Sequence, residues 1–253
     1  MKFRFLICLA LVAAVAALGG CMQMHSSTVI NKDGSGTASL TVSMSPAVAE
    51  ALQDMASSDM GSDQKVPDFN DIKKDDLVKA GKKHGVKITK FSRDEVDGRQ
   101  TLNIEMAFKD LKGLSFIMNR TLGDKDQNGG LGIFDAGDGN LVLRSTEYDF
   151  PADEEIAAET EEDSPEMDMP DMDPAKMQKS MEAMGKLMGA ISELDIRMEF
   201  TVPGDIVSTN APGTEGRTCI WTVNADNMMT AGQDMEPEIV FSGKGLKIKP
   251  MTD

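Results

Sequence analysis

Three pairs of alternating apolar and polar segments, each joined by a short turn, constrain the fold of this chain more than any other feature. The turns lie at residues 32–36, at Asp97 and Gly98, and at residues 137–140. Alternation with a period of two places apolar side chains on one face of a strand, and Asp-Gly or Gly-rich turns suit the tight connection of an antiparallel hairpin. The pattern therefore predicts three β-hairpins, over residues 27–46, 86–108 and 129–150.

Helices are expected between and after these hairpins. One covers residues 70–84, with Asn70 or Asp71 as N-cap and Gly85 just past its end, positions that favour these residue types. Another begins at Pro174 with Asp173 as N-cap. Three shorter helices are predicted over residues 47–55, 109–120 and 226–230. Strand-like alternation returns in residues 194–210, 217–225 and 238–249.

This order of elements favours an α+β fold over a parallel α/β sheet. Clustered hairpins separated by helices at irregular intervals suit an antiparallel sheet with several helices packed on it. Residues 153–173 interrupt the pattern, because they carry eleven acidic residues, two prolines and no Lys or Arg. Self-repulsion predicts a disordered acidic insert there. We therefore expect one domain, with residues 21–152 as its first part and residues 174–253 as its second.

The N-terminus indicates export and a lipid anchor. Lys2 and Arg4 precede an apolar run over residues 5–18, which is too short to span a bilayer as a helix and typical of a signal peptide. The following Gly19, Gly20 and Cys21 resemble the lipobox of bacterial lipoproteins. That resemblance implies cleavage after residue 20 and lipidation of Cys21, and two or more acyl chains suffice for stable anchoring.

The mature chain is strongly acidic and cannot form an internal disulfide. Removing residues 1–20 leaves 24 basic residues (26 minus Lys2 and Arg4) against 42 acidic ones, a net charge near −18. Nucleic acid and anionic lipid surfaces are therefore unfavourable partners. Once Cys8 has left with the signal and Cys21 is acylated, Cys219 remains alone. Two residues from Trp221 on a predicted strand, it is expected to be a small buried side chain.

Two segments resemble the LppM-type lipoprotein family. One is "TVPGDIVSTNAPGTEGRTCIWTV" at residues 201–223, with its Pro-Gly step, Asn210, Ala211 and Trp221 in the returning strand. The other is the lipobox followed by "VINKDGSGTASLTV" at residues 29–42. The resemblance implies an envelope-anchored α+β domain with no established catalytic residues. The long acidic and Met-rich insert departs from the family pattern.

The segment "DKDQNGGLGIFD" at residues 124–135 is similar to an EF-hand calcium loop. Its candidate ligands are Asp124, Asp126, Asn128 and Asp135, at positions 1, 3, 5 and 12, with Gly129 at the turn position. Asp135 stands where Glu is usual, and the following residues predict a strand instead of a helix. The same residue types also occur in ordinary surface turns, so both interpretations stay open.

Methionine supplies a second candidate site. The residues concerned lie in and after the acidic insert, at Met167, Met169, Met172, Met177, Met181, Met184 and Met188. The last four, with Ile191, follow a 4, 3, 4, 3 spacing that forms one stripe on a helix. Such a stripe is typical of a core, but Met-rich faces also bind partners or lipids, and thioethers bind Cu(I).

No catalytic motif is evident. The chain has no P-loop, nucleophile elbow or C-x-x-C, and nothing links His25 or His84 to Cys219. His84 follows Lys82 and Lys83 in the last turn of a predicted helix, where positive charge suits the dipole. We therefore expect a non-enzymatic lipoprotein that binds a lipid, another hydrophobic ligand or an envelope protein.

Met22, and not Asp, follows the anchor, which resembles the sorting pattern of Gram-negative envelopes and implies the outer membrane, facing the periplasm. The alternative function is a periplasmic metal-handling protein that uses the methionines for Cu(I) or the Asp-rich loop for calcium. No cofactor is expected for the first interpretation, whereas the second would bind calcium or Cu(I).

Overall fold

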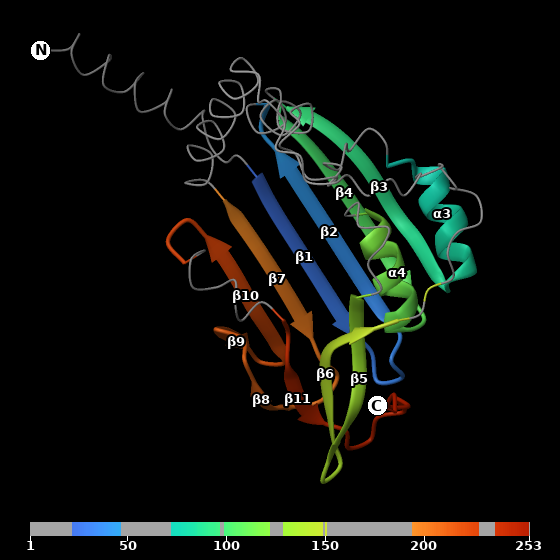
Figure 1. Cartoon of the computed structure of the whole chain (residues 1–253), viewed down its shortest axis with the longest axis vertical. Coiled ribbons are helices and arrows are strands. Elements are labelled where there is room, and N and C mark those ends of the chain that lie inside the picture. Colours follow the sequence, from blue (N-terminus) through green and yellow to red (C-terminus); the bar gives the residue numbers. More distant parts are fainter. Residues whose placement is uncertain are drawn as a thin grey trace, which may run out of the picture.

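The structure is a computed structural model that describes residues 22–46, 72–96, 99–121, 129–148, 150, 194–227 and 236–252. All structural statements below concern these residues. They form two β-sheets and two α-helices in two layers (Figure 1). A seven-stranded sheet is one layer, and the helices and a four-stranded sheet lie across one of its faces. The predicted α+β class is confirmed, although strands dominate.

The large sheet has the order β3-β4-β2-β1-β7-β10-β9 and the small sheet the order β5-β6-β11-β8. The large sheet contains β1 (Met22–Ile30), β2 (Gly36–Met44), β3 (Val86–Val96), β4 (Arg99–Phe108), β7 (Asp195–Thr201), β9 (Gly213–Glu215) and β10 (Thr218–Asn224). The small sheet contains β5 (Gly129–Gly137), β6 (Asn140–Glu147), β8 (Ile206–Thr209) and β11 (Ile239–Ser242). The helices are α3 (Lys74–Lys83) and α4 (Leu111–Thr121).

Turn chemistry explains the first hairpin. β1 and β2 pair antiparallel from Met22 opposite Met44 to Ile30 opposite Gly36. In the connection, Gly34 adopts φ +88°, and the backbone N–H and hydroxyl of Ser35 both donate to Asp33 Oδ1, at 3.1 and 2.7 Å. These bonds from Ser35 lower the pKa of the Asp33 carboxyl. The predicted hairpin over residues 27–46 is confirmed.

The other two hairpins are also confirmed. β3 pairs antiparallel with β4, and β5 with β6. The β5–β6 turn uses Asp138 at φ 53° and Gly139 at φ 78°. Two successive positive φ angles match the right-handed twist of the flanking strands, which is why Asp-Gly suits this position. Asp97 and Gly98 lie outside the described residues.

One strand pair differs from the antiparallel prediction. β1 pairs parallel with β7, from Gln23 opposite Asp195 to Val29 opposite Thr201. β1 is therefore the internal strand that joins the N-terminal hairpins to the C-terminal strands. Pro203 and Gly204 separate β7 from β8, so residues 194–210 form two strands in different sheets.

Two helices lie in the described part of the chain, and of the helix predicted over 226–230 only residues 226 and 227 are described, as part of a turn. α3 begins later than expected, because Lys73 is its N-cap and makes no side-chain capping bond. Asp75 and Asp76 in the first turn supply the negative charge that favours a helix start. The predicted start at Asn70 or Asp71 is therefore wrong. α4 confirms the helix predicted over 109–120, whereas helices 47–55 and 174 onward lie outside the described residues.

The core lies between the two layers. Alternate residues of β2, β4 and β10 face the helices and the small sheet, and burial of each large apolar side chain stabilises the fold by about 1.5–3 kcal/mol. The fully buried side chains include Leu40, Leu102, Ile104, Met106, Ile117, Leu143, Trp221, Ile239 and Phe241. Cys219 is fully buried, as predicted, and burial raises the pKa of its thiol. Trp221 meets Phe200 edge to face, 5.8 Å between ring centres.

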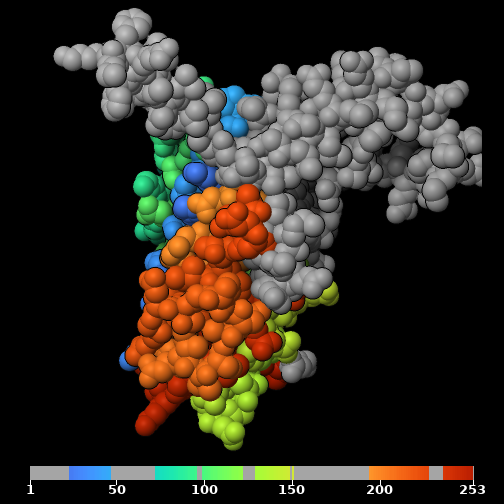
Figure 2. Space-filling view, turned by 90° about the vertical axis from the view of Figure 1, so that its left-hand side faces the viewer, coloured from blue at the N-terminus to red at the C-terminus, as the bar shows by residue number. Residues whose placement is uncertain are grey.

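The C-terminal residues form less strand than expected. β11 ends at Ser242, although alternation continues to Lys249. Gly245 adopts φ +76°, and the Lys247 N–H donates to Lys32 O in the β1–β2 turn. The tail therefore contacts the first hairpin, and it returns to the edge of the small sheet only at Met251, whose N–H donates to Ile133 O of β5 at 2.8 Å. Figure 2 shows the side formed by the C-terminal strands, with the β5–β6 hairpin projecting at the lower end.

Candidate functional site

Most of the residues that the sequence singles out lie outside the described part of the chain. These are Cys21, the acidic insert at 153–173, the stripe Met177, Met181, Met184, Met188 and Ile191, and the first three loop ligands Asp124, Asp126 and Asn128. The lipid anchor, the Met face and the soft-metal site therefore stay predictions.

Asp135 is the one described candidate ligand of the predicted calcium loop; the other three lie outside the described residues, so the calcium site stays a prediction. Asp135 lies on β5, six residues beyond Gly129, or about 20 Å along an extended strand. Its Oδ1 accepts a hydrogen bond from Gly137 N–H at 2.9 Å, and the side chain is exposed.

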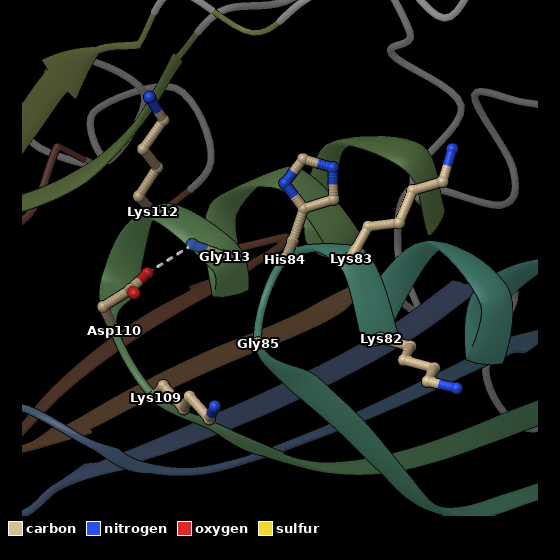
Figure 3. Close-up of a pocket in the computed structure, with 8 residues that line it drawn as sticks. All are labelled: Lys82, Lys83, His84, Gly85, Lys109, Asp110, Lys112 and Gly113. Carbon is tan, nitrogen blue, oxygen red and sulfur yellow. Dashed lines mark hydrogen bonds between the residues drawn. The ribbon is translucent and has the colours of Figure 1, made fainter.

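A basic hollow of about 370 Å³ opens where α3 ends and α4 begins (Figure 3). Its lining is Lys82, Lys83, His84, Gly85, Lys109, Asp110, Lys112 and Gly113. Four lysines against one aspartate give it a net charge of +3 with His84 neutral. The whole chain, by contrast, has a net charge of −16.

Glycine at two positions allows the backbone to form this hollow. His84 caps α3, and its N–H donates to Ala80 O and Gly81 O. Gly85 follows at φ +72°, which turns the chain into β3, and its carbonyl accepts from Lys109 N–H at 3.1 Å. Gly113 brings α4 so close to His84 that a Cβ there would lie 2.1 Å from the His84 carbonyl oxygen. Gly85 just past the helix end agrees with the sequence prediction.

Asp110 begins α4 and supplies the single negative charge of the hollow. Its Oδ1 accepts from Gly113 N–H at 2.8 Å, which is the bond of an N-cap residue. The carboxylate therefore already satisfies part of the helix start. The lysines are different, since no ion pair within the described residues includes Lys82, Lys83, Lys109 or Lys112.

Aromatic rings support one wall of the hollow. His84 stacks on Phe116 with 3.7 Å between ring centres, and Phe116 meets Phe150 edge to face at 5.3 Å. Lys112 Nζ lies 5.6 Å from the centre of the Tyr148 ring and 5.8 Å from that of Phe150. A cation over aromatic rings is favourable, so these contacts hold Lys112 at the rim.

Tyr148 fixes this wall to the small sheet. Its hydroxyl donates to Leu131 O at 2.6 Å, and the side chain is 6% exposed. Burial raises the pKa of Tyr148 to about 12, with a smaller contribution from the negative charge of Asp110. The phenol is therefore neutral and a hydrogen-bond donor at any physiological pH.

The outer face of the large sheet is a less promising site, because its polar groups bind one another. The hydrogen bonds between side chains of neighbouring strands include Thr41 to Asn103 at 2.9 Å, Ser43 with Thr101 at 2.9 Å and Thr201 with Thr218 at 2.8 Å. Near the start of β1, His25 Nε2 lies 3.0 Å from Asp195 Oδ2.

Only the α3 side of the basic hollow was predicted from the sequence. Lys82, Lys83 and His84 were predicted to lie at a helix end, where their positive charge suits the helix dipole. Lys109 lies just before α4 and Lys112 in its first turn, and only the fold brings them together with Lys82 and Lys83. The one sequence feature that could have indicated the hollow is the pair of lysines at each of two helix boundaries, the end of α3 and the start of α4.

Among the described residues, no group of three or more His, Cys, Asp or Glu side chains is placed to hold a metal ion. None of the helices in this part of the chain has the length and apolar character needed to cross a membrane.

Comparison with known proteins gave limited similarity. No family model matches the chain, and no curated protein does. Among solved structures, the chain is similar to the folded domain of LppM from Mycobacterium tuberculosis, determined by NMR. The TM-score is 0.37 and the sequence identity 11%, covering 88% of this chain and 89% of that one. Such a slight likeness carries no argument about function, so the proposals below rest on the residues of this chain.

Proposed function

We propose that this chain is a non-enzymatic envelope lipoprotein, anchored through Cys21, whose α+β domain binds an anionic ligand in the basic hollow. The observation that carries the binding function is the cluster of four lysines around one hollow of a strongly acidic protein. The anchoring rests on the lipobox, and the absence of enzymatic activity on the lack of a catalytic motif in the sequence.

Electrostatics favours an anion over other ligands. Like charges placed together repel one another, and within the described residues no ion pair offsets these four lysines. A bound phosphate or carboxylate would relieve that repulsion and form charge-assisted hydrogen bonds. Lysine ammonium groups act as compact point charges and do not demand the planar geometry that arginine does. The hollow therefore suits phosphates and carboxylates alike.

The experiment is a calorimetric titration of the mature chain, solubilised in mild detergent, with inorganic pyrophosphate. We compare it with the double variant Lys83→Gln, Lys109→Gln, which removes one charge from each side of the hollow. An exposed ion pair contributes up to about 1 kcal/mol, so losing two should weaken binding about tenfold. Salt should also weaken binding by the unmodified chain.

The matched control is Lys73→Gln, Lys74→Gln, which removes two charges at the other end of α3. Lys74 lies about 14 Å from Lys83 along the helix, farther than the screening length of about 8 Å. The control should bind pyrophosphate as the unmodified chain does. Equal weakening in both double variants would show that net charge, and not the hollow, governs binding. If the unmodified chain binds neither pyrophosphate nor a longer polyphosphate, the proposal is refuted.

The anchor has its own test. Mass spectrometry of the chain extracted from its envelope should give residues 21–253 plus a diacylglyceryl and an acyl group. The variant Cys21→Ser should carry no lipid and should leave the membrane fraction or retain its signal segment. An unlipidated chain that begins elsewhere would contradict anchoring through Cys21, whatever the result for the hollow.

A further inference from the structure

The position of the basic hollow relative to the anchor adds to the proposed function, on which this inference rests. Cys21 directly precedes Met22, the first residue of β1, so the lipid would be attached one residue from the strand. β1 then runs to Ile30, a rise of about 27 Å at about 3.3 Å per residue. Anchored in this way, the domain is linked to the membrane at the β1 start.

The hollow lies at the opposite end of the large sheet. Ile30 pairs with Gly36, Gly36 with Phe108, and Phe108 with Val86. Gly85 and Lys109, which line the hollow, are the chain neighbours of Val86 and Phe108. Figure 1 shows the same relation, with the start of β1 at the upper end of the sheet and the α3–β3 junction at the lower end.

The lysines of the hollow do not converge on one point. Figure 3 shows their ammonium groups spread around the Gly85 turn, with Lys112 and Lys83 on opposite sides of His84 and Lys109 and Lys82 below. A single small anion cannot contact all four groups in this arrangement. A ligand with several anionic groups along its length can contact them one after another, and linked contacts increase affinity by raising the effective concentration.

We infer that the hollow binds an extended anionic polymer, bearing phosphate or carboxylate groups, that lies outside the membrane in which the protein is anchored. The point of lipid attachment is separated from the hollow by the length of β1, about 27 Å, which is several times the screening length of about 8 Å at physiological ionic strength. The protein thus joins its membrane at one end to a polyanionic layer at the other.

The test uses the lipidated full chain in phosphatidylcholine vesicles, with fluorescent long-chain inorganic polyphosphate as the probe. We expect polyphosphate to bind at least about tenfold more tightly than pyrophosphate, and Lys83→Gln, Lys109→Gln to weaken it about tenfold or more. Lys73→Gln, Lys74→Gln serves as the control and should leave the affinity unchanged. Replacing part of the phosphatidylcholine in the same vesicles by phosphatidylglycerol should also leave it unchanged.

Two outcomes would overturn the inference while the proposed function stands. If phosphatidylglycerol in the anchoring bilayer lowers polyphosphate affinity about tenfold or more, the hollow lies within reach of its own membrane. If polyphosphate binds no more tightly than pyrophosphate, the hollow is a site for one small anion. If neither probe binds in detergent or in vesicles, the proposed function fails as well. The three results are therefore distinguishable.

Discussion

Tyr148 makes the stability of the domain depend on alkaline pH. Burial raises its pKa to about 12 in the folded chain, from about 10 when unfolded. A raised pKa means that the fold favours the neutral phenol. Its contribution to stability is therefore fully present below pH 10 and is lost as the pH rises toward 12. We expect the urea midpoint of the unmodified chain to fall across this window.

The measurement is specific because Tyr148 is the single tyrosine of the chain. Its phenolate absorbance should therefore titrate with a midpoint near 12. The variant Tyr148→Phe should lose about 1 kcal/mol at pH 7, because the bond to Leu131 O is gone, and should show a smaller fall between pH 10 and 12. A midpoint near 10 would mean that the hydroxyl is exposed in solution.

Asp110 is both the N-cap of α4 and the single negative charge of the hollow, and one substitution can remove the charge while keeping the cap. The variant Asp110→Asn keeps an effective N-cap for α4, because Asn and Asp are similarly favoured there. It also raises the net charge of the hollow from +3 to +4. We expect pyrophosphate affinity to rise about threefold with little change in the urea midpoint. Weaker binding would show that the carboxylate itself contacts the ligand.

At the scale of elements, the position of α4 depends on the absence of a side chain at Gly113. An alanine at Gly113 would place its Cβ 2.1 Å from His84 O, a backbone atom that cannot move alone. Gly113→Ala should therefore push α4 away from the α3–β3 turn, lower stability by about 1–3 kcal/mol and weaken anion binding.

Gly213→Ala, in β9, is the control for Gly113→Ala. The nearest atoms to its Cβ would lie at 3.6 Å, an ordinary contact. We expect its urea midpoint and its pyrophosphate affinity to remain those of the unmodified chain. Equal losses in Gly113→Ala and Gly213→Ala would contradict the close approach of α4 to His84.

The elements that can be predicted from the sequence are those determined by interactions between residues close together in the chain. The Asp33 to Ser35 bonds and the positive φ of Gly139 act within a few residues, so both hairpins could be foreseen. The parallel pairing of β1 with β7 could not, because nothing near Ser27 or Glu199 specifies the partner. The hollow could not be predicted either, because it is formed by the end of α3 and the start of α4, which only the fold brings together. Residue spacing alone also gives no measure of its volume.

At the scale of the whole molecule, β1 holds the two halves of the large sheet together. Ser27 pairs with Ser39 on one side and with Glu199 on the other. A proline here cannot donate to the strand ladder and is poorly tolerated in a central strand. Ser27→Pro should cost about 3 kcal/mol or more and abolish a single cooperative transition. Fluorescence of Trp221, the single tryptophan, reports the C-terminal half directly.

Ser27→Ala serves as the control for that substitution, since it keeps the backbone N–H and leaves both ladders intact. Its transition should remain cooperative, with a midpoint close to that of the unmodified chain. A cooperative transition in Ser27→Pro at an unchanged midpoint would mean that β1 is not required to join the halves.

The central position of β1 also sets the order in which the chain can fold during synthesis. A chain emerges N-terminus first, so β1 and β2 can form their hairpin early. The opposite edge of β1 then waits for β7, since His25 and Asp195 are 170 residues apart. Open strand edges invite pairing with other chains. An incompletely synthesised chain therefore leaves this edge open, whereas a complete one closes it with its own C-terminal strands.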